Sequence, residues 1–437
     1  MRIAHLSDLH ITEGPHLDDH RETLSRIVQA ALACNPHLWL LTGDFYGRTV
    51  PHRSTPRERA VLYPLVRQMA ETGPVVVLYG NHDFDPDLDS MALLGGRWPV
   101  YVVKVAESFR VVTPAGPARL WAIPYPAKKW LLAGEEKAPG VLQGQATAAS
   151  KLSMLLSLWT ARIQAARVAT RRDGFCEPHI FTAHAQVCGG RTSGGEVLAG
   201  QEIEIGQADL AMMGVDYGAL GHLHLRQEPA LRCWYPGSPW MNDHGEAKDI
   251  KGWHLVDIDT GDGIDPEPMD GEEPMAWDGV DYEGLQDGRA RVRVLLMGSS
   301  CRRFLTLDWS WGMGDDGRPR WLVEPAAGEW EHQVPGAIVR ARIEIAQDCA
   351  AACPWEQVEQ AIRALDPYRL TIERRQVGRL RVRAPTVAKA TSIDDKLQAL
   401  WSLQEPAPSA VEQEQALRLL QRLRTEDDQS IGQTWAG

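Results

Sequence analysis

The sequence predicts an α/β protein whose polar motifs follow its strands. Through the first 260 residues, apolar runs of strand length alternate with stretches of helical periodicity. Five short polar motifs lie directly after such apolar runs. Because α/β sheets bind ligands at the carboxyl ends of their strands, we expect these motifs to form one functional site.

The first predicted elements are alternating strands and helices. Leu24, Ile27 and Val28 lie on one face of a predicted helix, and the run from Val75 to Tyr79 is rich in β-branched residues, as strands are. In order, we expect a strand at 3–7, a helix at 21–33, a strand at 38–42, a helix at 58–71 and a strand at 75–79.

A long helix and further strands complete the first domain. We expect the helix at 145–172 and strands at 179–183, 217–220 and 253–258. Basic residues near the end of the helix predict a solvated face, with contact to a DNA backbone as the alternative. These residues are Arg162, Arg167, Arg171 and Arg172.

The composition changes after about residue 260. Asp, Glu, Gly and Pro dominate 261–288, which predicts an acidic linker. Residues 308–330 have no clear assignment. Strands at 291–296, 339–345, 369–372 and 380–383 and a helix at 355–364 predict a second, smaller domain. We therefore expect a first domain at 1–260, the linker at 261–288, an α+β domain at 289–390 and C-terminal helices at 391–437.

The overall composition is that of a globular protein with a large core. The 437 residues are 44% hydrophobic, and their net charge of −12 argues against an unaided, strongly basic nucleic-acid binder. Seven dispersed cysteines without a CxxC pair suit buried thiols in a reducing compartment. No signal-peptide pattern or membrane-length apolar run is present in the sequence, so we expect a cytoplasmic protein without membrane contact.

The five motifs supply Asp, His and Asn side chains in a pattern that suits two metal ions. Paired divalent cations need a bridging carboxylate and a mixed shell of nitrogen and oxygen ligands. A lone DxH or GD arises by chance, a lone HxH is weak evidence and GNHD after a β-branched strand is moderately specific, but the ordered set of five at strand ends is strongly specific. The motifs are Asp8-Leu9-His10, Gly43-Asp44, Gly80-Asn81-His82-Asp83, His184 and Gly221-His222-Leu223-His224.

These residue types predict hydrolysis of a phosphoester. Two cations about 3.5–4 Å apart can activate a shared water and neutralise phosphoryl charge. Asp44 can bridge both because a carboxylate offers two oxygens, and neutral His and the Asn81 amide can complete the shells. An imidazole close to the metals but not bound to them is the natural general acid, and His82 fits that role.

The ordered motifs resemble the calcineurin-like metallophosphoesterase superfamily. Within it, two further segments are similar to the nuclease subunits of SbcCD complexes, the counterparts of double-strand-break repair nucleases. The segment from Asp216 to His224 resembles that family's DYxALGHxH motif. The run Tyr235-Pro236-Gly237-Ser238-Pro239, followed by Gly245-Glu246 and Lys251-Gly252, resembles its YPGSP…GE…KG run.

The resemblance implies a fold and a set of metal ligands. The fold would be a four-layer αββα sandwich with a capping domain at 289–390 and C-terminal helices. The cofactors would be two divalent ions, most often Mn²⁺ with Mg²⁺ as the alternative, and His82 would be the catalytic histidine that binds neither. One ion would be held by Asp8, His10, Asp44 and His224, and the other by Asp44, Asn81, His184 and His222.

The resemblance also implies an activity and partners. Such enzymes degrade double-stranded DNA ends as 3′–5′ exonucleases and cut single strands or hairpins as endonucleases in DNA repair and recombination. The C-terminal helices would bind the coiled-coil base of an SMC-like ATPase (SbcC type). The nuclease would form a homodimer within a heterotetramer.

One departure and two alternatives accompany this interpretation. Relatives usually carry Asp or His three residues after the GD aspartate, near the catalytic histidine, whereas this chain has Gly47. The orientation of His82 is therefore in question, and His52 or Asp83 are candidates to compensate. The alternatives are a dinuclear enzyme acting on phosphoproteins or small phosphodiesters, and an inactive scaffold for the ATPase. The GDxxDRG and GNHE motifs usual in protein phosphatases are absent from the sequence.

Overall fold

The structure is a computed structural model. The part of the chain that it describes forms two compact units. One unit contains residues 1–308, 325–342 and 355–373, and the other contains 309–324, 343–354 and the residues from 374 onward. No helix among the described residues is long and apolar enough to cross a membrane. The described residues are 1–47, 53–84, 86–127, 131, 141–173, 177–194, 202–259, 276–283, 289–377, 393–402, 408–409, 412–413 and 415–417.

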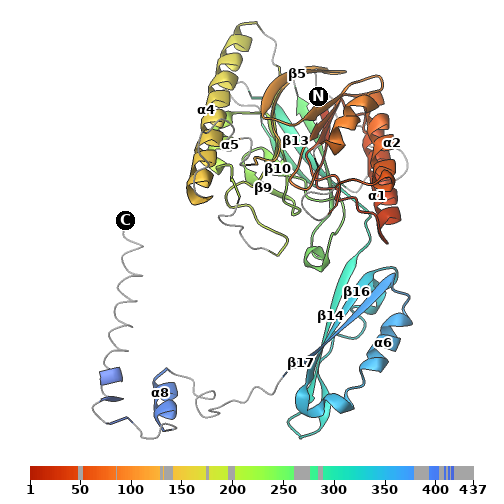
Figure 1. Ribbon diagram of the computed structural model, residues 1–437, viewed down its shortest axis with the longest axis vertical. Helices are drawn as coiled ribbons and strands as arrows, with labels where there is room; N and C mark the ends of the chain where they lie inside the picture. The colour runs from red at the N-terminus through yellow and green to blue at the C-terminus, as the bar shows by residue number, and fades with distance from the viewer. Residues whose placement is uncertain are drawn as a thin grey trace. The chain divides into compact units, whose positions relative to one another are not determined.

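Two mixed sheets form the centre of the first unit (Figure 1). The described strands of the larger sheet follow the order β12-β13-β11-β1-β2-β3-β4, in which β1 to β4 are parallel. These strands are β1 (Arg2–Leu6), β2 (Leu38–Leu41), β3 (Val75–Leu78), β4 (Val100–Val103), β11 (Gly252–Asp259), β12 (Ala276–Tyr282) and β13 (Arg291–Gly298).

The smaller sheet has the strand order β5-β6-β7-β8-β10-β9 among the described residues. Its central strands β6, β7 and β8 are parallel, and β5 and β9 are antiparallel edge strands. The strands are β5 (Glu107–Thr113), β6 (Gly116–Ile123), β7 (His179–His184), β8 (Tyr217–Gly221), β9 (Gln227–Ala230) and β10 (Cys233–Tyr235).

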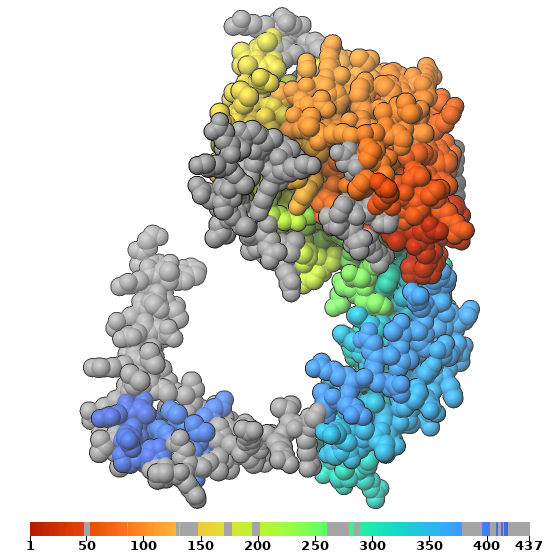
Figure 2. Space-filling view, viewed as in Figure 1, coloured from red at the N-terminus to blue at the C-terminus, as the bar shows by residue number. Residues whose placement is uncertain are grey.

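Helices cover the outer face of each sheet. Helices α1 (Leu17–Ala33) and α2 (Pro56–Thr72) lie side by side on the larger sheet, and their side chains form one surface in red and orange (Figures 1 and 2). Helices α4 (Val141–Asp173) and α5 (Gln207–Met213) pack on the smaller sheet. The first unit also contains the short 3₁₀ helices η1 (Asp87–Leu94), η2 (His244–Glu246) and η3 (Glu331–Gln333).

Three apolar cores separate these layers. Because successive strand residues face opposite sides, Leu38 and Leu40 of β2 lie in the core between the two sheets. Trp39 and Leu41 of the same strand face the core beneath α1 and α2. The smaller sheet divides its side chains in the same way between the central core and the core beneath α4 and α5. The layer order is helix, sheet, sheet, helix, which confirms the expected αββα sandwich.

The larger sheet extends beyond residue 260, where the sequence suggested that the first domain ends. Strand β13 pairs antiparallel with β11 along its whole length, and β12 pairs with β13. Val292 and Val294 of β13 fill the core between the sheets, so burial there fixes the strand in this unit. Strand β12 lies within the segment expected to be a linker. Residues 261–275 and 284–288 of that segment lie outside the described residues.

A third sheet has the strand order β15-β14-β16-β17. The segment 308–330, which had no assignment from the sequence, supplies most of a β14–β15 hairpin, and the Trp311 and Trp321 rings lie edge to face with centroids 5.0 Å apart. The predicted strand at 380–383 and most of the second C-terminal helix lie outside the described residues. The elements are β14 (Phe304–Met313), β15 (Pro319–Val323), β16 (Ile338–Ala346), η4 (Gln347–Ala352), α6 (Trp355–Arg363), β17 (Arg369–Val377) and α8 (Ile393–Trp401).

Asp216 anchors the chain where it enters β8. Its buried carboxylate accepts hydrogen bonds from the Arg167 guanidinium at 2.9 Å, the His179 backbone N–H at 2.8 Å and the Ala290 backbone N–H at 2.7 Å. Arg167 is itself buried and also donates to the Gly214 carbonyl at 2.9 Å. The expectation that this arginine lies on a solvated or DNA-facing surface is therefore wrong. Its charge pairs with Asp216 beneath α4 and fixes β8 against its neighbours.

We expect Asp216→Ala to lower the free energy of unfolding by about 3–5 kcal/mol, because it leaves the buried Arg167 charge without its partner. Urea denaturation followed by circular dichroism measures this change. The matched control is Asp281→Ala, which removes a 2.7 Å ion pair with Arg293 that is exposed to solvent. That substitution should change stability by less than about 1 kcal/mol. Equal losses in the two variants would contradict a structural role for the buried pair.

Candidate metal centre

All of the predicted site residues meet where five strands end. Strands β1, β2 and β3 of the larger sheet each lead into one motif, and β7 and β8 of the smaller sheet lead into the other two. Among the described residues, three overlapping groups have ligand atoms within 4.8 Å of one another. They are Asp8 with His10 and His224, His10 with Asp44 and His82, and Asp44 with His184 and His222.

Asp44 lies at the centre of these groups. Its Oδ2 atom is 3.7 Å from His10 Nε2, 3.4 Å from His184 Nε2 and 3.9 Å from His82 Nε2. Its Oδ1 atom accepts a hydrogen bond from the His82 backbone N–H at 2.9 Å. One buried carboxylate therefore faces imidazoles from three different strand ends, as a group that bridges two cations must.

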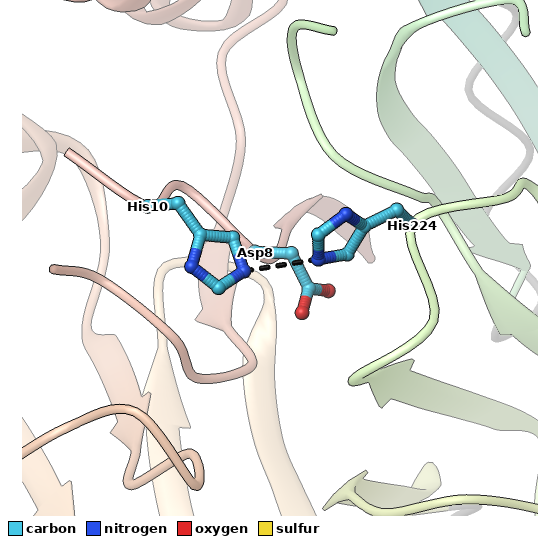
Figure 3. A group of neighbouring side chains, drawn as sticks. All are labelled: Asp8, His10 and His224. Carbon is cyan, nitrogen blue, oxygen red and sulfur yellow. Dashed lines mark hydrogen bonds between the residues drawn. The ribbon is translucent and has the colours of Figure 1, made fainter. Parts of the chain in front are cut away.

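His10 and His224 face each other next to Asp8 (Figure 3). His10 Nδ1 lies 2.6 Å from the Gly47 carbonyl, and His224 Nδ1 lies 2.6 Å from the Glu246 carboxylate. Because these oxygens only accept hydrogen bonds, each Nδ1 carries a proton. The neutral rings then direct lone pairs at each other from Nε2 atoms 3.0 Å apart. Two such acceptors beside a carboxylate fit a cation.

Asn81, His184 and His222 form a second convergence of acceptors. The Asn81 Oδ1 atom lies 3.0 Å from His184 Nε2 and 3.1 Å from His222 Nδ1. His184 donates from Nδ1 to the Thr42 carbonyl at 2.7 Å, and His222 places Nε2 3.0 Å from the Glu202 carboxylate. The inward-facing nitrogens therefore carry lone pairs in the neutral rings. An outward hydrogen bond such as the one from His184 to Thr42 is typical of histidines that ligate metals.

The backbone of four of these residues is in the left-handed region. The φ angle is 53° at Asp8, 42° at His10, 56° at Asp44 and 107° at His222. Residues other than glycine seldom adopt such angles, and each one costs about 1–3 kcal/mol. The strained turns direct the side chains of strand-end residues toward a common point.

Two motif glycines allow the turns to approach closely. A Cβ atom on Gly80 would lie 2.0 Å from Asp44 Oδ1, and one on Gly43 would lie 2.3 Å from His184 Nδ1. Gly43 also has a φ angle of 96°, which favours glycine. The glycines that precede Asp44 and Asn81 in their motifs are therefore required by the space next to the acceptor groups.

Asp83 joins two of the strand-end turns. Its buried carboxylate accepts hydrogen bonds from the backbone N–H groups of Asp44, Phe45 and Gly80, each at 2.9 Å. Burial and the nearby Asp44 charge raise the pKa of this carboxyl to about 7. The sequence marked Asp83 only as a group that could compensate for Gly47, but its hydrogen bonds go to the backbone around Asp44.

His82 lies next to Asp44, and no hydrogen bond to a described residue fixes the orientation of its ring through Nδ1. This Nδ1 atom is buried. Burial lowers the pKa of its imidazole. Gly47, at the position where relatives carry Asp or His, contributes its backbone carbonyl to His10 instead. His52, the other candidate to compensate, lies outside the described residues.

The residues of the YPGSP…GE…KG run support His224. Glu246 Oε2 lies 2.8 Å from the Lys251 ammonium and accepts from the Asn242 backbone N–H at 2.9 Å. Lys251 also donates to the Ser238 hydroxyl at 2.9 Å. The sequence reveals this run only as a family pattern, without roles for its members. Glu202 carries no signal in the sequence, because no recognisable motif surrounds it.

Protons compete with cations for both acceptor groups. Burial lowers the pKa of His184, but the Asp44 charge outweighs it and raises this pKa to about 9. Burial likewise opposes protonation of His224, yet its hydrogen bond to Glu246 leaves the pKa raised. Burial lowers the pKa of His10 to about 4. The imidazole of His184 is therefore protonated and positively charged at neutral pH in the absence of an ion, whereas that of His10 is neutral.

We expect divalent metal binding to release protons and to strengthen as the pH rises from 6 toward about 9. The reason is that a raised pKa keeps each imidazole protonated up to that pKa, and an ion can bind only after the proton leaves. Titration calorimetry with Mn²⁺ in buffers of different ionisation enthalpy measures the number of protons released. An affinity that does not change with pH, with no proton release, would contradict this account of the centre.

A solved structure and a family model are similar to this chain. A solved structure of GAP50, the anchor in the inner membrane complex of Plasmodium, is similar at 13% identity over 52% of this chain and 67% of that chain, with a TM-score of 0.30. The family model for calcineurin-like phosphoesterases matches residues 1–225. This family consists of hydrolases that use paired metal ions, and its model covers more than half of the chain. The protein therefore belongs to the calcineurin-like phosphoesterase family.

Proposed function

We propose that the protein is a Mn²⁺-dependent DNA nuclease, the phosphodiesterase subunit of an SbcCD-like complex. The observation that carries the proposal is the convergence of imidazoles, Asn81 and Asp8 around the buried Asp44 carboxylate. The choice of DNA rests on the resemblance of the segments at 216–224 and 235–252 to nuclease subunits. In the second segment, Glu246 contacts His224 and is held by Lys251, which also donates to Ser238. In the first, Asp216 fixes the start of the strand that leads to His222.

We assign the ligands of the two ions from the two convergences of acceptors. Asp44 belongs to both groups because its Oδ2 atom faces imidazoles of each. When bound, the ions would lower the pKa of a water molecule and neutralise phosphoryl charge. The choice of Mn²⁺, with Mg²⁺ as an alternative, rests on the resemblance to nuclease subunits. The first group is Asp8, His10, Asp44 and His224, and the second is Asp44, Asn81, His184 and His222.

His82 is our candidate for the proton donor to the leaving oxygen. Its side chain is 18% exposed, whereas the Asp44 carboxylate is 2% exposed, so the imidazole lies nearer to solvent and to an arriving substrate. Burial lowers its pKa in the free protein. A phosphate anion close to the ring favours the protonated imidazole, which counters that effect. The ring can then deliver a proton from Nε2.

The partners also belong to this proposal. Helix α8 contains Leu397, Leu400 and Trp401, and Leu400 is 46% exposed. An amphipathic helix of this kind can dock on a partner groove, which suits the coiled-coil base of an SMC-like ATPase. A homodimer within a heterotetramer, and an intracellular role in DNA repair and recombination, follow from the same resemblance.

We expect the purified protein with Mn²⁺ to degrade labelled linear duplex DNA from its ends, and EDTA to stop the reaction. The assay is run with and without the proposed ATPase partner. Hydrolysis of a chromogenic phosphodiester without any cleavage of DNA would favour an enzyme of small phosphodiesters. Metal binding without hydrolysis of either substrate would favour a scaffold.

We expect His82→Ala to lower the rate of DNA cleavage by about 100- to 10,000-fold while both ions remain bound, because general acid catalysis contributes a factor of that size. Single-turnover kinetics and metal analysis of the same preparation measure the two effects. The control is His332→Ala, at an exposed histidine outside the centre. Loss of metal together with activity in His82→Ala would contradict the assignment of His82 as a residue that binds no ion.

A further inference from the structure

The four inward-facing imidazoles are oriented in two different ways. His10 and His184 donate their outer N–H to backbone carbonyls. His224 and His222 instead face carboxylates, Glu246 at 2.6 Å and Glu202 at 3.0 Å. A carboxylate that accepts the outer N–H fixes the ring and raises the basicity of the nitrogen that binds a metal. Each acceptor group therefore contains one imidazole with carboxylate support.

Glu246 is held rigidly and is part of the network already described. Its side chain is 6% exposed, and its second oxygen receives the Lys251 ammonium and a backbone N–H. The carboxylate thus has one fixed position toward His224. The acceptor group that contains His224 also has Asp8 as a carboxylate of its own, in addition to the shared Asp44.

Glu202 faces His222 in the acceptor group that contains Asn81, and it is more exposed than Glu246. Its side chain is 31% exposed, and its Oε2 atom faces His222 Nε2. The Tyr125 hydroxyl hydrogen-bonds to the same carboxylate, and the Tyr125 ring packs against His222 with centroids 6.0 Å apart. Tyr125 and His222 thus hold Glu202 from two sides.

The group around His222 depends more strongly on such support. Apart from the shared Asp44, it contains the neutral Asn81 amide and two imidazoles, whereas the other group contains the charged Asp8. A site with fewer charged ligands relies more on the basicity and orientation of its imidazoles. Loss of a carboxylate behind His222 should therefore affect this ion selectively.

We propose that Glu202 is a positioning residue for His222 and that, with Tyr125, it controls binding of the ion on the Asn81 side without altering the other ion. The inference rests on the ligand assignment in the proposed function. Glu202 contacts neither substrate nor metal in this scheme, and it acts by fixing the His222 ring with Nδ1 directed at Asn81 Oδ1. Because Glu202 is not one of the proposed ligands, its substitution should affect one ion and leave the other in place.

The test is Mn²⁺ titration of the full chain by calorimetry and by electron paramagnetic resonance. We expect Glu202→Ala to weaken one of two binding steps by about 10- to 100-fold and to leave the other within about twofold. With the same amount of Mn²⁺ added, the electron paramagnetic resonance spectrum of the unaltered protein should be that of a spin-coupled pair of ions. The spectrum of Glu202→Ala should be that of an isolated ion. Glu202→Gln, which keeps an oxygen acceptor without charge, should give a smaller loss, and Tyr125→Phe should weaken the same step.

The matched control is Glu204→Gln, two residues along the same segment. Glu204 accepts hydrogen bonds from Gln186 at 2.9 Å and Cys188 at 3.0 Å. This variant should bind both ions like the unaltered protein, and thermal unfolding should be similar in all variants. Unchanged binding in Glu202→Ala, or equal weakening of both steps, would overturn the inference. An unaltered protein that binds fewer than two ions would instead refute the ligand assignment itself.

Discussion

The buried carboxylate of Asp44 is the group on which the arrangement of the centre depends. Its oxygens receive a backbone N–H from the β3 turn and face imidazoles that follow β1, β3 and β7. A charge in this position is stable only if cations or protonated rings surround it. The strand ends of both sheets must therefore remain in register with one another. The Asp83 carboxylate contributes to this by binding three backbone N–H groups of the β2 and β3 turns.

Contacts far from the centre also keep the strand ends of the two sheets aligned with each other. The core between the two sheets fixes their separation, and the buried pair of Arg167 and Asp216 fixes the start of β8, whose end carries His222. Lys251, directly before β11, forms an ion pair with Glu246, and Glu246 contacts His224. These contacts connect β11 to the centre. The packing of the sheets and the geometry of the centre therefore depend on each other, because each sheet contributes side chains to both groups of acceptors.

Local patterns in the sequence predict the α/β class, the first strands and the convergence of the motifs on one site. These features depend on residues that are close together in the sequence. Local patterns do not predict a contact between residues that are far apart in the sequence. Apolar alternation at 291–298 identifies a strand but not the sheet that it joins. Arg167 resembles any helix-end arginine until Asp216 is placed beside it. Glu202 has no motif, since its role depends on a ring twenty residues further along the chain.

The left-handed backbone at the ligand-bearing turns has a consequence for the choice of substitutions. Asp8 and Asp44 adopt φ angles of 53° and 56°. Asparagine tolerates this conformation far better than alanine does, because its short polar side chain can hydrogen-bond locally. An alanine at either position removes the carboxylate and also favours a different turn, so its effect mixes chemistry with chain geometry. Asparagine keeps the turn and a side-chain oxygen, so it isolates the loss of negative charge better than alanine does.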